Sequence, residues 1–265
     1  MRHYKLTDET ITLGNGTVLH RIECVEPIPE KGINVGDKGG YIENEDNLSG
    51  NAWVSGKACV YGSARVSDNA CVSGNARVYG SAWVSDNAEV SIDARVYGNA
   101  WVSGKACVSG NAHVYGKAIV CDNAHVYGNA KVYDRAGVYD KAWVYGEARV
   151  YGNARVSGNA WVYDNAWVYG EARVSGKACV SDNAEVSGNA IINTNADYIV
   201  FKNWWSSLRY FTWTRSNNKW CVGCFYGTGE ELIAKAYKDS DKSGREYERV
   251  VRYVESILEN EKEIQ

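Results

Sequence analysis

A six-residue pattern of hydrophobic and polar positions repeats from about Gly39 to Asn195. The second residue of each hexad is nearly always Ala and the fourth is nearly always Val, as in the hexad N-A-W-V-S-G of residues 51–56. Alternate side chains of a strand point to the same face, so Ala and Val share one apolar face. The sixth residue is nearly always Gly or Asp, and both tolerate turn conformations. The pattern therefore predicts one short strand and one corner from each hexad, which is an all-β solenoid.

The fifth hexad position indicates the size of one coil. Tyrosine recurs there in steps of eighteen residues, which is three hexads. The other two registers of the fifth position are mostly Ser, as at residues 55, 73, 91 and 109 and at 67, 85 and 103. Residues eighteen apart therefore stack on one side of a three-sided coil, with the spacing of neighbouring strands, about 4.8 Å. The tyrosine column consists of Tyr61, Tyr79, Tyr97, Tyr115, Tyr133, Tyr151 and Tyr169.

Residues 1–38 precede the array and predict an N-terminal β-hairpin cap. Residues 10–13 and 18–22 alternate apolar and polar side chains, and G-N-G at residues 14–16 separates them. An open end of a solenoid exposes unpaired strand groups, so we expect this segment to cover the first coil. The hexads of residues 39–195 then form the solenoid.

Residues 196–265 predict a small α+β domain. Three segments, 198–201, 210–214 and 220–226, have the composition of strands. Thr228 and Glu231 form a capping box that begins a helix ending near Lys238. A second helix is predicted from about Gly244, with an apolar face that docks on the sheet of its own domain or on the last coil.

The layout resembles hexapeptide-repeat proteins of bacteriophage and prophage genomes, which are often labelled as transferases. The resemblance rests on the repeat, on Y-K-L-T-D-E-T at residues 4–10, on G-G-Y-I-E-N-E-D-N-L-S at 39–49 and on C-V-G-C-F-Y-G-T at 221–228. It implies a left-handed parallel β-helix with three hexads per coil, and a phage protein acting in the cytoplasm of a bacterial host. It implies no particular biochemistry. From the outer faces described below we expect a scaffold or sequestering protein that binds a partner, and the phage resemblance adds counter-defence against the host as one role.

The same fold also implies an alternative, a trimeric acyltransferase-like enzyme using acyl-CoA. Such enzymes use a histidine as general base. The array contains two candidates, His113 and His125, which lie twelve residues apart and are predicted on different faces. Neither has an Asp or Glu beside it to orient the ring, and no insertion interrupts the hexads between residues 45 and 194. We therefore expect a non-enzymatic protein that needs no cofactor.

One face combines tyrosines with cations and is the predicted ligand-binding site. The third hexad position on the tyrosine face carries five basic side chains on successive coils, and phenols beside guanidinium groups suit phosphate or carboxylate. The expected ligand is an anionic small molecule, a nucleotide or an acidic host protein. A solvated structural face stays open as an alternative, because like charges one coil apart repel by only roughly 0.9 kcal/mol in water. The candidate residues are Arg77, Arg95, His113, Lys131 and Arg149 with Tyr79, Tyr97, Tyr115, Tyr133 and Tyr151.

Four tryptophans predict contacts between subunits. Trp83 and Trp101 are eighteen residues apart on a second face, and Trp143 and Trp161 are eighteen apart on the third. Exposed aromatic pairs are typical of interfaces, so we expect a homo-oligomer, and the family resemblance favours a trimer.

The eight cysteines do not predict a disulfide framework or a metal site. Cys71, Cys107 and Cys179 share one column but are separated by two and four coils, beyond disulfide reach. The C-V-G-C motif at 221–224 offers only two metal ligands. The net charge of −3 excludes a global attraction to nucleic acid, and no segment is apolar enough to span a bilayer, so we expect no membrane partner.

Overall fold

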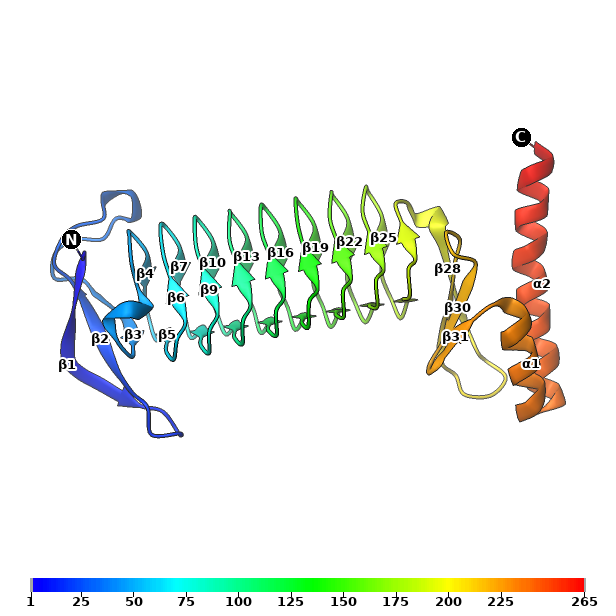
Figure 1. Ribbon diagram of the computed structural model, residues 1–265, viewed down its shortest axis with the longest axis horizontal. Coiled ribbons are helices and arrows are strands. Elements are labelled where there is room, and N and C mark those ends of the chain that lie inside the picture. The colour runs from blue at the N-terminus through cyan, green and yellow to red at the C-terminus, as the bar shows by residue number, and fades with distance from the viewer. Residues whose placement is uncertain (1, 265) are drawn as a thin grey trace.

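The computed structural model is a parallel β-solenoid of stacked three-sided coils, followed by a small domain of one sheet and two helices (Figure 1). It describes residues 2–264, and side chains for residues 2–261. Met1 and Gln265, the outer ends of the predicted cap and C-terminal domain, lie outside the described residues. The prediction of an all-β solenoid with three hexads per coil is confirmed.

Each hexad forms one two-residue strand from its third and fourth positions, and each coil contributes one strand to each of three sheets. One strand position along a sheet is called a rung below. Sheet A contains β5 (Cys59–Val60), β8 (Arg77–Val78), β11 (Arg95–Val96), β14 (His113–Val114), β17 (Lys131–Val132), β20 (Arg149–Val150), β23 (Trp167–Val168) and β26 (Glu185–Val186).

Sheet B and sheet C form the other two sides. Sheet B contains β6 (Arg65–Val66), β9 (Trp83–Val84), β12 (Trp101–Val102), β15 (Ile119–Val120), β18 (Gly137–Val138), β21 (Arg155–Val156), β24 (Arg173–Val174) and β27 (Ile191–Ile192). Sheet C contains β4 (Trp53–Val54), β7 (Cys71–Val72), β10 (Glu89–Val90), β13 (Cys107–Val108), β16 (His125–Val126), β19 (Trp143–Val144), β22 (Trp161–Val162) and β25 (Cys179–Val180).

The inward side chains form one continuous core. From Ala52 to Ile192, the second and fourth positions of every hexad are at most 2% exposed. The corner residue at the sixth position has a φ between 55° and 72° throughout residues 50–188. This left-handed conformation is the reason that Gly and Asp occupy the corners. Several corner aspartates also stack, since the Asp86 carboxylate accepts a hydrogen bond from the Gly104 N–H of the next coil at 3.0 Å.

The N-terminal cap is a three-stranded extension of sheet A. It consists of β1 (Tyr4–Thr12), β2 (Val18–Cys24), η1 (Pro29–Lys31), β3 (Lys38–Ile42) and η2 (Glu45–Asn47), and β3 pairs with β5. Ile22 and Ile28 are buried in the same core as the coils, so the cap covers the first coil as expected. The hairpin is longer than predicted, because β1 begins at Tyr4; a register shift between Leu6 and Thr10 interrupts the alternation that marks a strand.

The C-terminal domain follows η3 (Asn195–Asp197) and has an antiparallel sheet D of β28 (Tyr198–Lys202), β29 (Tyr210–Thr214), β30 (Lys219–Val222) and β31 (Phe225–Gly227). The helices α1 (Gly229–Asp239) and α2 (Asp241–Ile264) pack on sheet D, with Phe211 and Trp220 in the shared core. The Thr228 capping box is confirmed.

Two predicted boundaries in this domain are wrong. The single strand expected over residues 220–226 is a hairpin, because Gly223 turns the chain with a φ of +57°. The second helix starts at Asp241 instead of Gly244, where the Ser240 hydroxyl accepts a hydrogen bond from the Ser243 N–H at 3.1 Å and caps the first turn.

Sheet D also terminates the solenoid. In the array, each third-position N–H donates to an Ala carbonyl of the next coil, and the last coil has no such carbonyl above it. Side-chain oxygens replace it on all three sheets: Asn195 Oδ1 accepts from the Cys179 N–H at 2.7 Å, Thr212 Oγ1 from Glu185 at 2.9 Å and Ser216 Oγ from Ile191 at 2.7 Å. η3 and the C-terminal domain therefore satisfy strand groups that would otherwise be unpaired.

Candidate functional site

The seven predicted tyrosines form an unbroken stack on sheet A. Neighbouring ring centroids from Tyr61 to Tyr169 lie 4.9–5.0 Å apart, and the ring planes differ by at most 6°. Partial burial raises the pKa of Tyr97 and Tyr115, and raises that of Tyr151 to about 12. These phenols are therefore neutral at physiological pH and can donate hydrogen bonds.

The spacing of the rings limits what the stack can bind. Inserting an aromatic base between two rings needs about 6.8 Å, twice the rise of stacked bases, whereas the centroids are 4.9–5.0 Å apart. The faces of the inner rings are thus covered by one another. The stack offers ring edges and hydroxyl groups to a ligand, and stacking planes only at its ends.

The basic side chains form a second column beside the tyrosines. The strand register pairs Arg77 with Arg95, Arg95 with His113, His113 with Lys131, and Lys131 with Arg149. Among the side chains that the structure describes, none of these cations lies within the 4.0 Å ion-pair distance of a carboxylate. We call this column and the seven tyrosines the tyrosine–cation strip. Its charges are available to a ligand.

His113 differs from its neighbours in charge. Its ring lies edge-on to Tyr97, with 6.1 Å between the ring centroids. Burial, and then the charges of Arg95 and Lys131, lower the pKa of His113. The imidazole is therefore neutral at pH 7, and the charge of the strip comes from Arg77, Arg95, Lys131 and Arg149.

The C-terminal end of the strip is closed by the last coils and sheet D. The Arg149 guanidinium lies 4.8 Å from the centre of the Trp167 ring, a cation–π contact. Above it, the Tyr169 hydroxyl and the Cys221 thiol are 3.0 Å apart, and Cys221 Sγ lies 3.2 Å from Glu185 Oε2. Burial raises the pKa of Glu185. A cavity of about 310 Å³ at this end is lined by Glu147, Arg149, Asn165, Trp167, Asn183 and Glu185.

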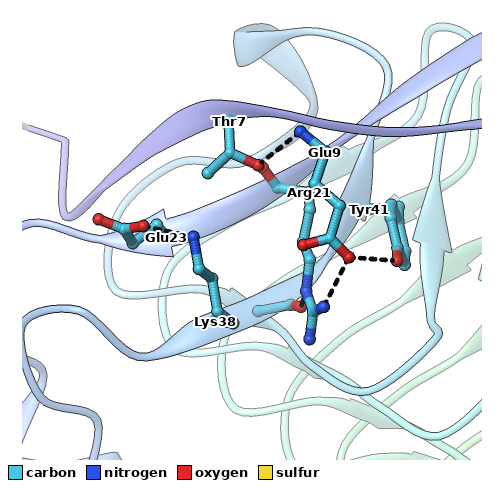
Figure 2. A network of polar contacts seen from close by, with 7 residues as sticks. Thr7, Glu9, Arg21, Glu23, Lys38 and Tyr41 are labelled. Carbon is cyan, nitrogen blue, oxygen red and sulfur yellow. Dashed lines mark hydrogen bonds and ion pairs between the residues drawn. The ribbon is translucent and has the colours of Figure 1, made fainter.

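The N-terminal end of the strip is closed by ion pairs of the cap. Figure 2 shows Arg21 donating to Glu9 Oε1 at 2.7 Å and the Tyr41 hydroxyl donating to the same oxygen at 3.3 Å. Tyr41 pairs in register with Cys59, directly below the strip. The Arg21 hydrogen bond lowers the pKa of Glu9, so this carboxylate is charged and already paired. The free cations begin at Arg77.

The two array histidines lie on different sheets, as predicted. His113 is on sheet A and His125 on sheet C, where its ring is 4.5 Å from that of Trp143. The structure does not bring them together, and no carboxylate hydrogen-bonds to either ring among the described residues.

The predicted tryptophan pairs occupy adjacent rungs of the other two sheets. Trp83 and Trp101 stack on sheet B with 5.6 Å between ring centroids, and each is 45% exposed. Trp143 and Trp161 stack on sheet C at 5.9 Å.

Sequence reasoning missed a second tyrosine column on sheet C. Tyr127, Tyr145 and Tyr163 stack at 4.9–5.0 Å beside the tryptophans. Following the fifth position of sheet C beyond Ser109 would have found it, since Ser gives way to Tyr at residue 127.

All eight cysteines are free, and Glu89 separates Cys71 from Cys107 on sheet C. Cys221 is buried, whereas Cys224 is exposed. Within residues 2–261, no cluster of three or more His, Cys, Asp or Glu side chains has the geometry of a metal site.

Comparison with known families supports the repeat architecture. Residues 70–86 and 148–164 match the YdcK beta solenoid repeat. The two matches start 78 residues apart, which is a multiple of six but not of eighteen. The matches therefore reflect the six-residue repeat and do not select one face of the solenoid. The chain is a β-solenoid repeat protein. A search of curated proteins found no match. No helix in the described part of this solenoid protein is long and apolar enough to cross a membrane.

Proposed function

We propose that the protein is a non-enzymatic solenoid that binds an extended acidic protein segment along the tyrosine–cation strip. The observation that carries the proposal is the column of four cations at Arg77, Arg95, Lys131 and Arg149, which have no carboxylate partner within residues 2–261 and stand beside phenols that donate hydrogen bonds. Arg77 and Arg95 are exposed, and the others are half-buried.

The shape of the strip favours an extended ligand over a nucleotide. Arg77 and Arg149 are separated by four rungs, roughly 19 Å at the usual strand spacing, so a single phosphate group can contact only one or two of the cations. The covered ring faces offer no stacking position for a base along the strip. A segment carrying several carboxylates can contact the whole column, with charge-assisted hydrogen bonds from guanidinium groups and neutral ones from phenols.

Binding of poly-glutamate, measured by calorimetry at low salt, tests the proposal. The double variant Arg77→Glu/Arg95→Glu should lose binding, because it replaces two free cations by two anions on adjacent rungs of sheet A. The chain offers a matched control, Arg155→Glu/Arg173→Glu. These two arginines occupy the same hexad position on adjacent rungs of sheet B, are exposed, and have no tyrosine column beside them. The control should bind like the wild type.

Three results would contradict the proposal. Unchanged binding by the sheet A variant would remove the strip from recognition. An equal loss in the sheet B control would indicate non-specific attraction. Binding of acetyl-CoA that is abolished by His113→Ala would contradict the non-enzymatic part and favour the acyltransferase alternative.

A further inference from the structure

The outward side chains of sheet C are large towards its C-terminal end and small towards its N-terminal end. Its C-terminal half carries large aromatic side chains in both outward columns, and we call it the aromatic half: His125, Tyr127, Trp143, Tyr145, Trp161 and Tyr163. Its second to fourth rungs carry short side chains in the same columns apart from one Glu, and we call them the small half: Cys71, Ser73, Glu89, Ser91, Cys107 and Ser109. Trp53 on the first rung is buried and lies outside this surface.

The aromatic half is a packed block. Besides the two stacks along the sheet, the Tyr127 ring lies edge-on to Trp143 with centroids 5.8 Å apart, and Tyr145 lies edge-on to Trp161 at 6.3 Å. The rings of Tyr127, Trp143, Tyr145 and Trp161 are therefore held by neighbours both along and across the sheet. The block still presents surface to solvent, since Trp161 is 43% exposed.

We propose that two copies of the chain pack sheet C against sheet C as an antiparallel dimer. Sheet C has eight rungs, and the second copy is turned end over end. The fourth rung of one copy then faces the fifth rung of the other, the third faces the sixth and the second faces the seventh. Cys107 then faces His125, Glu89 faces Trp143 and Cys71 faces Trp161. In the fifth-position column, each serine of the small half faces a tyrosine of the aromatic half. Apart from Glu89 opposite Trp143, large side chains meet small ones on these rungs, which is the self-complementarity that a two-fold interface requires.

The cap adds a matching charge at the edge of this surface. Lys31 Nζ lies 3.0 Å from Cys71 Sγ, on the second rung of sheet C. In the antiparallel arrangement, Trp161 of the second copy faces this rung. An ammonium group opposite an indole ring is a favourable cation–π arrangement.

Other packings fit less well. End-over-end packing of sheet A places the guanidinium groups of Arg95 and Arg149 against each other, so like charges meet. Parallel packing of sheet C places aromatic half on aromatic half and leaves the small halves apart. Sheet B packed on itself sets the large Trp101 against the large Arg155, and the large Trp83 against the large Arg173.

The size of the interface sets the concentration at which the dimer forms. Six rungs at about 4.8 Å and a face about five residues wide, at ~3.3 Å each, give roughly 450 Å² per copy in projection. Over both copies this is about 900 Å², below the roughly 1,000 Å² that stable interfaces exceed, so the interface is a weak one. We therefore expect micromolar dissociation, which requires measurement over a range of concentrations.

Sedimentation analysis of the full chain from low to high micromolar concentration tests the proposal. The wild type should be in monomer–dimer equilibrium. Trp143→Arg/Trp161→Arg should raise the dimer dissociation constant at least about tenfold, the effect expected for central aromatic residues. The matched control is Trp83→Arg/Trp101→Arg, the same pair of adjacent rungs on sheet B, and it should leave the constant unchanged. Arginine occupies this hexad position at Arg155 and Arg173, so both variants should fold.

Amine cross-linking with mass spectrometry tests the orientation. Lys105 precedes the fourth rung of sheet C, and in the antiparallel dimer it lies about one rung from Lys105 of the second copy. A Lys105–Lys105 link, which can form only between chains, is expected. Lys177 precedes the eighth rung and would be about seven rungs, roughly 34 Å, from its equivalent, so its self-link is not expected.

A monomer at all concentrations, a trimer, loss of the dimer in the sheet B control alone, or a Lys177–Lys177 link would each overturn the proposal. Poly-glutamate binding uses sheet A, so its failure or success is measured separately from this dimer.

Discussion

Replacing Ile92 by Asp should stabilise the solenoid. Ile92 is the one β-branched residue among the described corners of the array, and its φ of +65° lies in the left-handed region. A β-branched side chain there is strained by about 1–2 kcal/mol, because its Cβ approaches the backbone. Asp tolerates this conformation better, as Asp86 and Asp68 show at the same hexad position.

The net gain from Ile92→Asp should be about 1 kcal/mol. Relief of the strain contributes about 1–2 kcal/mol. The new carboxylate can accept the N–H of Gly110, the next corner of that column, as Asp86 accepts that of Gly104, for about 0.5–1 kcal/mol. Ile92 is 55% exposed, so the loss of its remaining burial costs about 1 kcal/mol.

Urea unfolding followed by circular dichroism measures the change, and amide hydrogen exchange of the coils around residue 92 locates it, since a solenoid can open locally. Ile92→Gly separates the two contributions: it relieves the strain but adds no acceptor and loses more entropy on folding, so it should be near neutral. The reverse change, Asp86→Ile, should destabilise by about 2 kcal/mol. The reasoning is refuted if Ile92→Asp gains nothing while Asp86→Ile costs nothing.

Two further predictions concern the junction between the last coil and sheet D. Thr212→Val removes the acceptor of the Glu185 N–H and should destabilise the junction by about 1–3 kcal/mol, seen as faster amide exchange at Glu185; unchanged exchange would contradict the capping role. Glu185→Gln should remove a pH dependence: burial raises the pKa of Glu185, so the folded chain favours the protonated carboxyl, and that stabilisation is present at low pH and lost as pH rises through the raised pKa. The thermal midpoint of the variant should therefore vary less with pH than that of the wild type and exceed it at neutral pH, and parallel pH profiles would contradict this.

The array was predictable because one rule assigns every residue of the hexads to a side of the coil and to an inward or outward position. A step of eighteen residues returns to the same side of the coil, so Tyr97 and Tyr115 had to stack, and Arg77 and Arg95 had to be neighbours. The strand register confirms both placements. The core is equally local in sequence, since each coil packs only on the coils above and below it.

The ends of the solenoid were less predictable because their partners are distant in sequence. Thr212 caps Glu185 from 27 residues away, and Ser216 caps Ile191 from 25 residues away. No period links these residues. The sequence around a Thr or Ser does not indicate whether its hydroxyl caps another element. The split of β30 and β31 depended on the left-handed Gly223, which a strand-like composition does not reveal.

The placement of the candidate side chains on one sheet was predictable from sequence, but their charge states and ring packing were not. Register alone could place His113 among the cations, yet its charge state depends on burial and on Arg95 and Lys131 together. Register could also align the phenols, yet only the ring planes show that their faces cover one another.

The different chemistry of the three sheets follows from how a solenoid accepts substitutions. A change at an outward position alters one rung of one sheet and leaves the buried Ala and Val of that coil in place. Each sheet can therefore acquire its own surface. The cations that make sheet A attractive to an acidic segment also oppose its packing on a second copy, because Arg95 and Arg149 would meet. Sheet C carries a single formal charge, Glu89, over its six central rungs, and this charge faces an aromatic ring in the proposed dimer. Binding of an acidic partner thus requires a cationic surface, whereas self-association requires a nearly uncharged one. The eighteen-residue period keeps these two surfaces on separate sides of the same coil.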